Sequence, residues 1–337
     1  MYNVLLLTRK DDPKTSILRQ TAGRLGISDD GQFRFFVGDD IEPDFLVVLS
    51  KAFREPVTYN VARQNTLLLT TEPASVLRYP GKYCQQFGTV FTCQENLSTG
   101  NNIYTHAVLP WFAGLGKNNG ENIVNIDYDD FSRQGALPKT KLISVITSNK
   151  TFTAGHRRRL QFVTRLKEHF GDRLDLYGSG IRGFNDKYDV LAPYKYHIAI
   201  ENSCEKYYWT EKMADCFLSD VYPIYCGCTN ITEYFPEDSL STFTLNDFEG
   251  TCRLIERLIS EEAYENSRAA RQEAKKLILG KYNLVNMIAR HFSQCDAEAP
   301  KEQITFLPER HFFNLHNFYQ KNFSHAIGKV QQMLRIH

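Results

Sequence analysis

Residues 194–227 read YKYHIAIENSCEKYYWTEKMADCFLSDVYPIYCG, and this stretch decides the fold prediction. Its segment Tyr196–Ile200 is largely apolar without alternation, which predicts a strand covered on both faces of a parallel sheet. The polar residues Glu201-Asn202-Ser203 follow directly. Ligands of open α/β sheets bind beyond the carboxyl ends of the strands, so residues 201–203 mark a candidate ligand site.

A helix is predicted to begin shortly after this strand. Thr210 is a favourable N-cap, and Glu211 and Lys212 occupy the first helical turn. A helix start with free backbone N–H groups and an added ammonium suits a diphosphate. An ordinary β-α-β unit, with Thr210 as a cap and the two charges in solvent, explains the same residues equally well.

The first part of the chain predicts a doubly wound α/β domain. Helical spacing of apolar residues marks Lys14–Leu25, and Arg54–Arg63 is a short connecting segment. These two segments lie between three predicted buried strands, Asn3–Thr8, Phe45–Leu49 and Asn65–Thr70. The resulting order is β, α, β, α, β, with the strands parallel.

A polar and acidic stretch, Asn118–Lys139, predicts the boundary between two domains. A second α/β series follows it, with strands at Lys141–Thr147, Leu174–Tyr177, Tyr196–Ile200 and Val221–Tyr225, and helices at Gly155–Phe170, from Thr210, and within Thr251–Phe292. The predicted domains are 1–137 on the acceptor side and 138–300 for nucleotide-sugar binding. Residues 301–337 form a helical tail that is expected to dock back on the protein.

Composition excludes several functions. The chain has 40 Lys plus Arg against 39 Asp plus Glu, so it offers no broad basic surface for nucleic acid. The apolar run near the N-terminus is too short for a signal peptide or a membrane span. Eight cysteines without a CxxC pair predict reduced thiols. Asp127-Tyr128-Asp129 has the spelling of a metal motif but falls in the predicted boundary segment.

The order YKYHIAIENS, six residues, then TEKMADCFLSDVYPIYCG resembles the donor-binding signature of the α-1,3/4-fucosyltransferases. The resemblance implies a GT-B fold of two Rossmann-like domains facing across a cleft. It implies GDP-fucose as donor substrate, no metal cofactor, and inverting transfer of L-fucose to a hydroxyl of an acceptor glycan, such as O3 of N-acetylglucosamine. Ile200 and Trp209 stand where the family often has Phe and Val, and both remain apolar.

Carried over by position, the resemblance implies that Asn202, Tyr208, Glu211 and Lys212 line the GDP-sugar pocket. Lys212 is expected to meet a phosphate, Glu211 a ribose or sugar hydroxyl, and Tyr208 to lie near the nucleotide.

The strand Lys141–Thr147 is followed by Ser148 and Asn149 and then by a helix with three consecutive arginines. The family has Ser-Asn at this place and an Arg seven residues before a helix Leu, which picks out Arg159 as the partner of Lys212 on the diphosphate. The alternative is a solvated arginine face, expected for Arg157 and Arg158. His156, at the helix start, is a weaker candidate.

Glu72 is the predicted general base. The segment Thr71-Glu72-Pro73-Ala74-Ser75 follows a strand and resembles the family segment that carries its proposed base. Inversion needs a carboxylate that removes the acceptor proton while the sugar leaves its diphosphate. A surface Glu before a turn-forming Pro is the alternative interpretation.

Two other functions remain open: the same scaffold with a different nucleotide sugar, and a catalytically silent glycan- or nucleotide-binding protein. The expected partners are GDP-fucose and an acceptor oligosaccharide or glycolipid, such as a surface polysaccharide or lipopolysaccharide precursor. The chain resembles the bacterial branch of the family. A cytoplasmic location is expected, with peripheral contact to the inner face of the membrane through the C-terminal tail.

Overall fold

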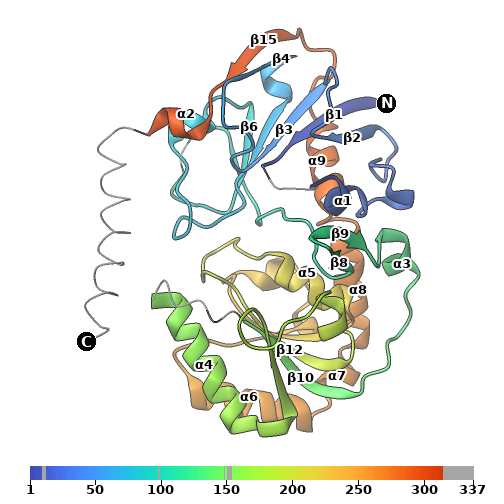
Figure 1. Cartoon of the computed structure of the whole chain (residues 1–337), viewed down its shortest axis with the longest axis vertical. Helices are drawn as coiled ribbons and strands as arrows, with labels where there is room; N and C mark the ends of the chain where they lie inside the picture. Colours follow the sequence, from blue (N-terminus) through green and yellow to red (C-terminus); the bar gives the residue numbers. More distant parts are fainter. Residues whose placement is uncertain (10–12, 98, 148, 150–153, 314–337) are drawn as a thin grey trace.

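Two parallel sheets, one in each half of the chain, organise the structure (Figure 1). This computed structural model describes residues 1–9, 13–97, 99–147, 149 and 154–313, with the backbone alone at 13 and 154–156. The two α/β halves lie one above the other in Figure 1, and the N-terminus belongs to the upper one. The prediction of two Rossmann-like α/β units is therefore confirmed.

The first sheet has the strand order β2-β1-β3-β5-β6-β7, with every neighbouring pair parallel. Its strands are β1 (Tyr2–Leu7), β2 (Phe33–Val37), β3 (Phe45–Leu49), β5 (Thr66–Leu69), β6 (Thr89–Thr92) and β7 (Asn102–Tyr104). Strand β1 shows why the strands are apolar at successive positions. Val4 and Leu6 join the core on one face, while Leu5 joins the core on the other face.

The second sheet has the order β11-β10-β12-β13-β14 and is also parallel. Its strands are β10 (Lys141–Ile146), β11 (Leu174–Tyr177), β12 (Tyr194–Ile200), β13 (Tyr222–Cys226) and β14 (Ser241–Thr242). Helices cover both faces. Residues of α4 (Ala154–Phe170) and α6 (Phe248–Ser260) pack on one face, and residues of α5 (Glu211–Leu218) and α8 (Arg268–Leu279) pack on the other. The short helix α7 (Ala263–Asn266) follows α6.

After α8 the chain returns to the first domain. Helix α9 (Leu284–Phe292) packs into the core beneath the first sheet, and strand β15 (Glu302–Phe306) pairs antiparallel with β4 (Val57–Val61). The predicted second domain, 138–300, therefore contains a helix that belongs spatially to the first domain. Of the predicted tail, 301–337, residues 301–313 contact the first domain through β15, and residues 314–337 lie outside the description.

Two local predictions were wrong. Lys14–Leu25 is not one helix, because α1 (Pro13–Leu18) ends early and Gly23 and Arg24 adopt left-handed φ angles of 57° and 58°. Arg54–Arg63 contains β4, whose alternating apolar residues form an edge strand. The boundary segment, Asn118–Lys139, holds most of a hairpin and a helix. These elements are β8 (Leu115–Asn118), β9 (Glu121–Val124) and α3 (Tyr128–Arg133). The short helix α2 (Gly81–Cys84) lies earlier in the chain, between β5 and β6.

The Asp127-Tyr128-Asp129 sequence has a structural role. Asp127 is the N-cap of α3, where its carboxylate accepts the Asp130 N–H at 3.1 Å and the Arg24 Nε–H at 2.7 Å. The Asp129 carboxylate accepts the N–H of Gly23 at 2.8 Å. Both acids therefore fasten α3 to the first domain. None of the helices in the described ranges is long and apolar enough to cross a bilayer.

Candidate active site

A buried carboxylate, Glu201, lies at the centre of the candidate site. It follows β12 and donates its N–H to the carbonyl of Cys226 at 2.8 Å, which places it at the carboxyl edge of the second sheet. Its carboxylate accepts hydrogen bonds from the Thr210 N–H and the Thr210 hydroxyl, both at 2.9 Å, and from the Lys212 ammonium at 3.0 Å. The strand end is thus tied directly to the start of α5.

Lys212 is held between two acids. Its Nζ lies 3.0 Å from Glu201 Oε2 and 3.4 Å from Glu211 Oε1, and its side chain keeps 25% of its surface exposed. Burial by itself would lower the pKa of Lys212. The charges of Glu201 and Glu211 outweigh burial and raise that pKa well above its ordinary value. Lys212 is therefore a permanent cation that still reaches the surface.

The start of α5 differs from the expectation of free N–H groups. The Thr210 N–H is donated to Glu201, and the Lys212 N–H points to the Thr210 hydroxyl at 3.4 Å. A negative side chain at a helix N-terminus is favoured by the helix dipole. Glu201 thus occupies the place at which the sequence predicted an incoming anion.

A second lysine, Lys187, completes the charge network. Its ammonium lies 2.7 Å from the buried Asp215 and 3.9 Å from Glu211. The other oxygen of Asp215 accepts the N–H groups of Phe112 and Ala113, both at 2.9 Å, so α5 is anchored to the chain segment that precedes β8. These contacts hold the helix start in place.

The sequence analysis missed Lys187 and Asp215. It placed Glu201 in the candidate ligand site but did not predict its pairing with Lys212, although an acid directly after a buried strand and eleven residues before a lysine is a candidate partner for that lysine. Lys187 lies in a loop, and no spacing in the sequence around it indicates a partner for it.

Arg159 reaches the same network from α4. Its Nη1 donates to Asn202 Oδ1 at 2.9 Å, whereas its Nε is buried and has no hydrogen-bond partner among the described residues. Burial lowers the pKa of Arg159, and the charge of Glu201 opposes that shift. Asn202, which Arg159 contacts, directly follows Glu201, which Lys212 contacts. The two predicted phosphate-binding cations therefore bond adjacent residues of one loop.

The neighbouring arginines differ from Arg159 in exposure. Arg157 and Arg158 are exposed, as the solvated-face interpretation predicted for them. The side chain of His156 lies outside the description, and so does Ser148.

Asn149 packs tightly against a glycine loop of the second domain. Its N–H donates to the carbonyl of Ser179 at 3.1 Å. Gly180 has a φ of +76°, which favours glycine, and a Cβ atom there would come within 2.0 Å of the Asn149 side-chain amide and displace it. Asn149 is thus positioned at the carboxyl edge of β10, next to the strand that precedes Glu201.

Tyr208 joins the two domains. It is buried against Cys93 and Ala107, which come from the first domain. Burial raises the pKa of the Tyr208 phenol well above its ordinary value, and the charges of Glu201 and Glu72 raise it further.

Glu72 itself is half-buried at the carboxyl edge of the first sheet, three residues after β5. Its backbone carbonyl accepts the side-chain amide of Gln94 at 2.8 Å, which fixes the segment. Further along, the hydroxyls of Ser75 and Ser203 lie 3.2 Å apart, one from each domain. The segment that contains Glu72 thus faces the loop after β12.

The surroundings of Trp209 explain why a large aromatic ring fits where the family often has Val. Its ring stacks on His106 of the first domain, with centroids 3.9 Å apart and planes 5° apart. Three more aromatic rings surround the pair: Tyr234, Phe235 and Tyr282. Burial lowers the pKa of His106 to about 3, so the stacked ring is neutral. This contact between the domains had no signal in the sequence.

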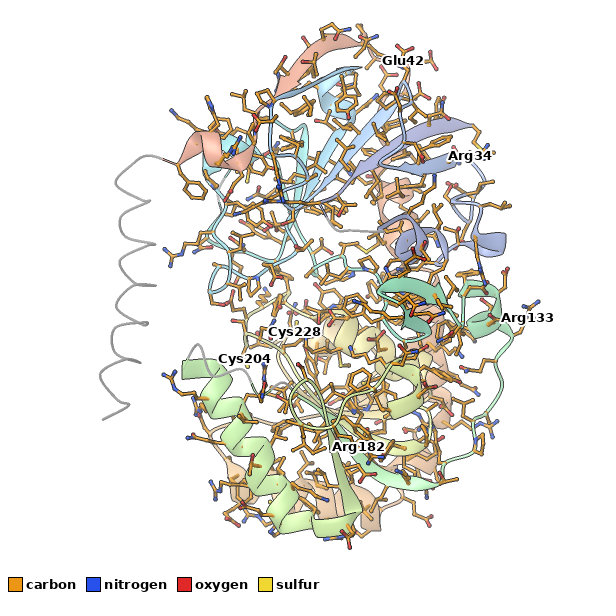
Figure 2. The ribbon with its side chains drawn as sticks, in the orientation of Figure 1. Arg34, Glu42, Arg133, Arg182, Cys204 and Cys228 are labelled. Carbon is orange, nitrogen blue, oxygen red and sulfur yellow. The ribbon has the colours of Figure 1, made fainter. Side chains whose placement is uncertain are left out.

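Two thiols lie beside the site. Cys204 is exposed, and its sulfur lies 3.6 Å from that of the buried Cys226. Cys204 and Cys228 both lie in the part of the second domain that faces the first (Figure 2). Within the described ranges, no group of three His, Cys, Asp or Glu side chains could hold a metal ion.

Comparison with known proteins identifies the family that part of the chain resembles. Residues 136–269 match the sequence model of glycosyltransferase family 10 (fucosyltransferase), C-terminal part. This match confirms the resemblance to the fucosyltransferase family for the second domain.

Two curated relatives share part of the sequence. The chain is 27% identical to Alpha-(1,3)-fucosyltransferase B of Drosophila melanogaster over 197 residues, which are 51% of this chain and 43% of the relative. It is 31% identical to a putative fucosyltransferase-like protein of Arabidopsis thaliana over 99 residues, or 28% of this chain and 19% of the relative. The chain therefore spans less than half the length of either relative.

A crystal structure of an α1,3-fucosyltransferase shares the fold. The likeness has a TM-score of 0.51 at 14% identity and covers 87% of this chain and 89% of the other. The predicted GT-B arrangement is confirmed by this similarity.

Proposed function

We propose that this chain, whose residues 136–269 match the family 10 fucosyltransferase domain, transfers L-fucose from GDP-fucose to a hydroxyl of an acceptor glycan, with inversion. The hydroxyl is O3 of N-acetylglucosamine or a similar sugar. The observation that carries the proposal is that Arg159 and Lys212 bond the adjacent residues Asn202 and Glu201, at 2.9 and 3.0 Å. The segment that contains Glu72 faces the same loop through the contact of Ser75 with Ser203.

Arg159 is the first contact for the diphosphate in this proposal. Its buried Nε has no partner among the described residues, so an anion would satisfy a donor that is already desolvated. Lys212 is the second contact, because its ammonium can give up the longer 3.4 Å contact to Glu211 and keep Glu201. Glu211, once released, can accept a hydroxyl of the ribose or the sugar.

Asn202 and Tyr208 position the donor in this scheme. Asn202 is exposed and already bonded to Arg159, so it can turn the guanidinium toward the phosphates. Tyr208 supplies a buried aromatic surface near the nucleotide. Asn149 lies at the sheet edge next to it, and a donor contact of Ser148 stays a prediction.

The transfer needs one base and one stabilised leaving group. The acceptor oxygen attacks C1 of fucose while the bond from C1 to the β-phosphate oxygen breaks, and the Glu72 carboxylate takes the acceptor proton. The charge that develops on GDP is stabilised by Arg159 and Lys212. These two cations supply positive charge that a divalent metal supplies in other transferases, so we propose a metal-independent reaction.

The test combines donor screening with one substitution. Purified full-length chain is incubated with GDP-fucose, GDP-mannose and UDP-galactose over a glycan array, with and without EDTA. Wild type is expected to transfer fucose alone, with EDTA having no effect. Glu72→Gln is expected to bind GDP as tightly as wild type and to lose transfer by roughly 10²–10⁴-fold. Glu95→Gln, an exposed acid of the same domain, is the matched control.

The outcomes separate the alternatives. Transfer of another sugar would favour the same scaffold with a different donor. GDP-fucose binding without transfer to any glycan would favour a silent binding protein. Full activity of Glu72→Gln would remove Glu72 as the base. The cytoplasmic location, the lipopolysaccharide-type acceptor and the membrane contact of residues 301–337 stay predictions.

A further inference from the structure

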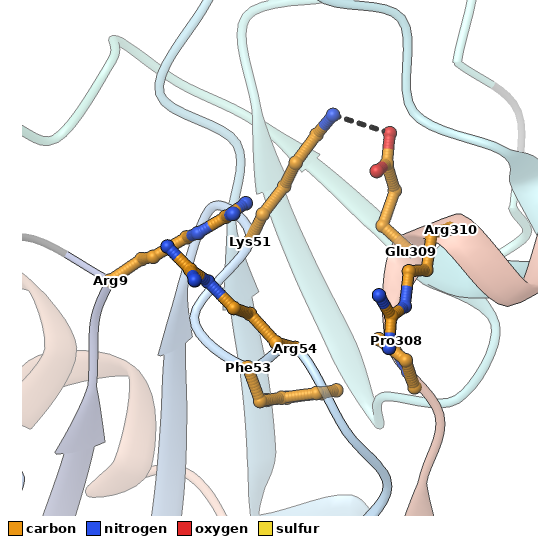
Figure 3. A pocket seen from close by; sticks show the side chains of 7 residues that line it. All are labelled: Arg9, Lys51, Phe53, Arg54, Pro308, Glu309 and Arg310. Carbon is orange, nitrogen blue, oxygen red and sulfur yellow. Dashed lines mark ion pairs between the residues drawn. The ribbon is translucent and has the colours of Figure 1, made fainter.

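A pocket of about 280 Å³ lies in the first domain (Figure 3), and none of its lining residues is a proposed donor residue. Its walls come from the loops after β1 and β3 and from the segment after β15. The residues that line it are Arg9, Lys51, Phe53, Arg54, Pro308, Glu309 and Arg310.

The lining is strongly cationic, with four basic side chains against one carboxylate. That carboxylate, Glu309, is buried and pairs with Lys51 at 2.6 Å. Arg310 pairs with Glu55, which lies outside the lining. Within the described ranges, Arg9 and Arg54 form no ion pair, and both are exposed. A concave wall of one charge concentrates counter-ions, so the pocket attracts an anion.

Arg9 and Arg54 are arranged to share that anion. In Figure 3 their side chains extend toward each other, across the pocket from Glu309. Guanidinium groups bind carboxylates and phosphates through two parallel hydrogen bonds. Phe53 and Pro308 add an apolar wall beside the charges, which suits a ligand that is not a bare ion.

The pocket lies at the same edge of the first sheet as Glu72, the proposed base. Arg9, Lys51 and Glu72 each follow one of three neighbouring parallel strands, β1, β3 and β5. They therefore lie at the same carboxyl edge of the first sheet. With strands about 4.8 Å apart, the ends of β1 and β5 are separated by roughly 10 Å, which a short oligosaccharide can span.

We propose that this pocket binds an anionic substituent of the acceptor glycan, a carboxylate or a phosphate, while Glu72 faces the accepting hydroxyl. Arg9 and Arg54 contact the anion, and Lys51 is held in place by Glu309. The inference rests on the proposed fucosyl transfer and extends it by naming the acceptor class. An acceptor with such a group near its accepting hydroxyl is preferred over its neutral counterpart.

The test measures kcat and KM of the full chain with matched acceptor pairs. N-acetyllactosamine is compared with its 3′-sialylated form, which adds a carboxylate, and N-acetylglucosamine with its 6-phosphate. We expect wild type to prefer at least one charged form by about tenfold or more in kcat/KM, since an ionic hydrogen bond is worth roughly that factor. The pair that shows the preference identifies the anion.

The variants Arg9→Gln and Arg54→Gln, singly and together, are expected to remove this preference by raising KM for the charged acceptor with little change in kcat. Arg34→Gln, an exposed arginine on β2, is the matched control and should leave the preference intact. Equal kcat/KM for both members of each pair in wild type, or a preference that survives the double variant, overturns the proposal.

Binding measurements separate this failure from failure of the proposed function. Affinity of the same glycans is measured calorimetrically in the presence of GDP, and GDP affinity is measured alone. If GDP binds but no fucose is transferred, the calorimetric preference still tests the pocket. If fucose is transferred without any charge preference, only the pocket assignment is wrong.

Discussion

The ammonium of Lys212 lies 3.0 Å from the carboxylate of Glu201, which is itself fully buried at the carboxyl edge of the second sheet. This ion pair connects the end of β12 with the start of α5. It also places a cation at the surface of the proposed donor site while its partner stays out of solvent. Stability and the proposed donor contact therefore involve the same side chain.

Replacing Lys212 with Met is expected to destabilise the protein by about 3–5 kcal/mol, because Glu201 and Glu211 lose the cation between them in a buried setting. Urea unfolding at pH 7 measures the change. Lys195→Met is the control, since Lys195 pairs with Glu265 at the surface and should cost less than about 1 kcal/mol. Equal losses in the two variants would contradict the structural importance of the Lys212 pair.

Arg159→Gln is expected to weaken GDP binding by roughly 10- to 100-fold and to leave the melting temperature nearly unchanged. The guanidinium is partly desolvated and, among the described residues, has one side-chain hydrogen bond, to Asn202, so the fold gains little from it. Isothermal calorimetry with GDP and a thermal melt provide both values. Arg158→Gln, from the exposed part of α4, should bind GDP like wild type. Unchanged GDP affinity in Arg159→Gln would exclude a phosphate contact.

Acid sensitivity is expected from His106. Burial lowers its pKa to about 3 in the folded protein, against about 6.5 in the unfolded chain, so only the unfolded chain binds a proton between these values. The associated stability is present above pH 6.5 and is lost as the pH falls toward 3. Its slope is about 1.4 kcal/mol per pH unit near pH 5.

The substitution His106→Phe tests this, because phenylalanine keeps a flat ring against Trp209 and cannot bind a proton. The slope of unfolding free energy between pH 6 and 4 should fall by about 1.4 kcal/mol per unit. The buried His197, whose pKa burial also lowers to about 3, remains in the variant and keeps part of the slope. An unchanged slope would show that His106 is protonated in the fold.

Cys204 is expected to be the first cysteine modified by iodoacetamide at neutral pH. The hydrogen bond with the Cys226 thiol lowers the pKa of Cys204 to about 7, and the side chain is exposed. Mass spectrometry should show half-maximal alkylation rates near pH 7, and GDP should slow the reaction because Asn202 is two residues away. Cys295, whose pKa is raised by burial, is the internal control. Faster alkylation of Cys295 would contradict the assignment.

Local sequence determined much of the second domain and the sheet of the first. The limits of the strands at Phe45–Leu49 and Leu174–Tyr177 agree with the structure, because apolar residues at successive positions suit strands covered on both faces. The N-cap at Thr210 agrees for a similar reason, since a hydroxyl before a helix satisfies a backbone donor wherever the helix packs. The family signature in residues 194–227 then indicated the kind of ligand.

Tertiary structure alone decided which elements meet. Helix α9 has the apolar face of any amphipathic helix, and nothing in its spacing shows that it packs beneath the first sheet. Strand β15 pairs with β4 across about 240 residues of chain, and Arg9 and Arg54 come from different loops to line one pocket. Periodicity follows from the geometry of a single helix or strand. The choice of partner follows from burial summed over the whole fold, which no local window of sequence contains.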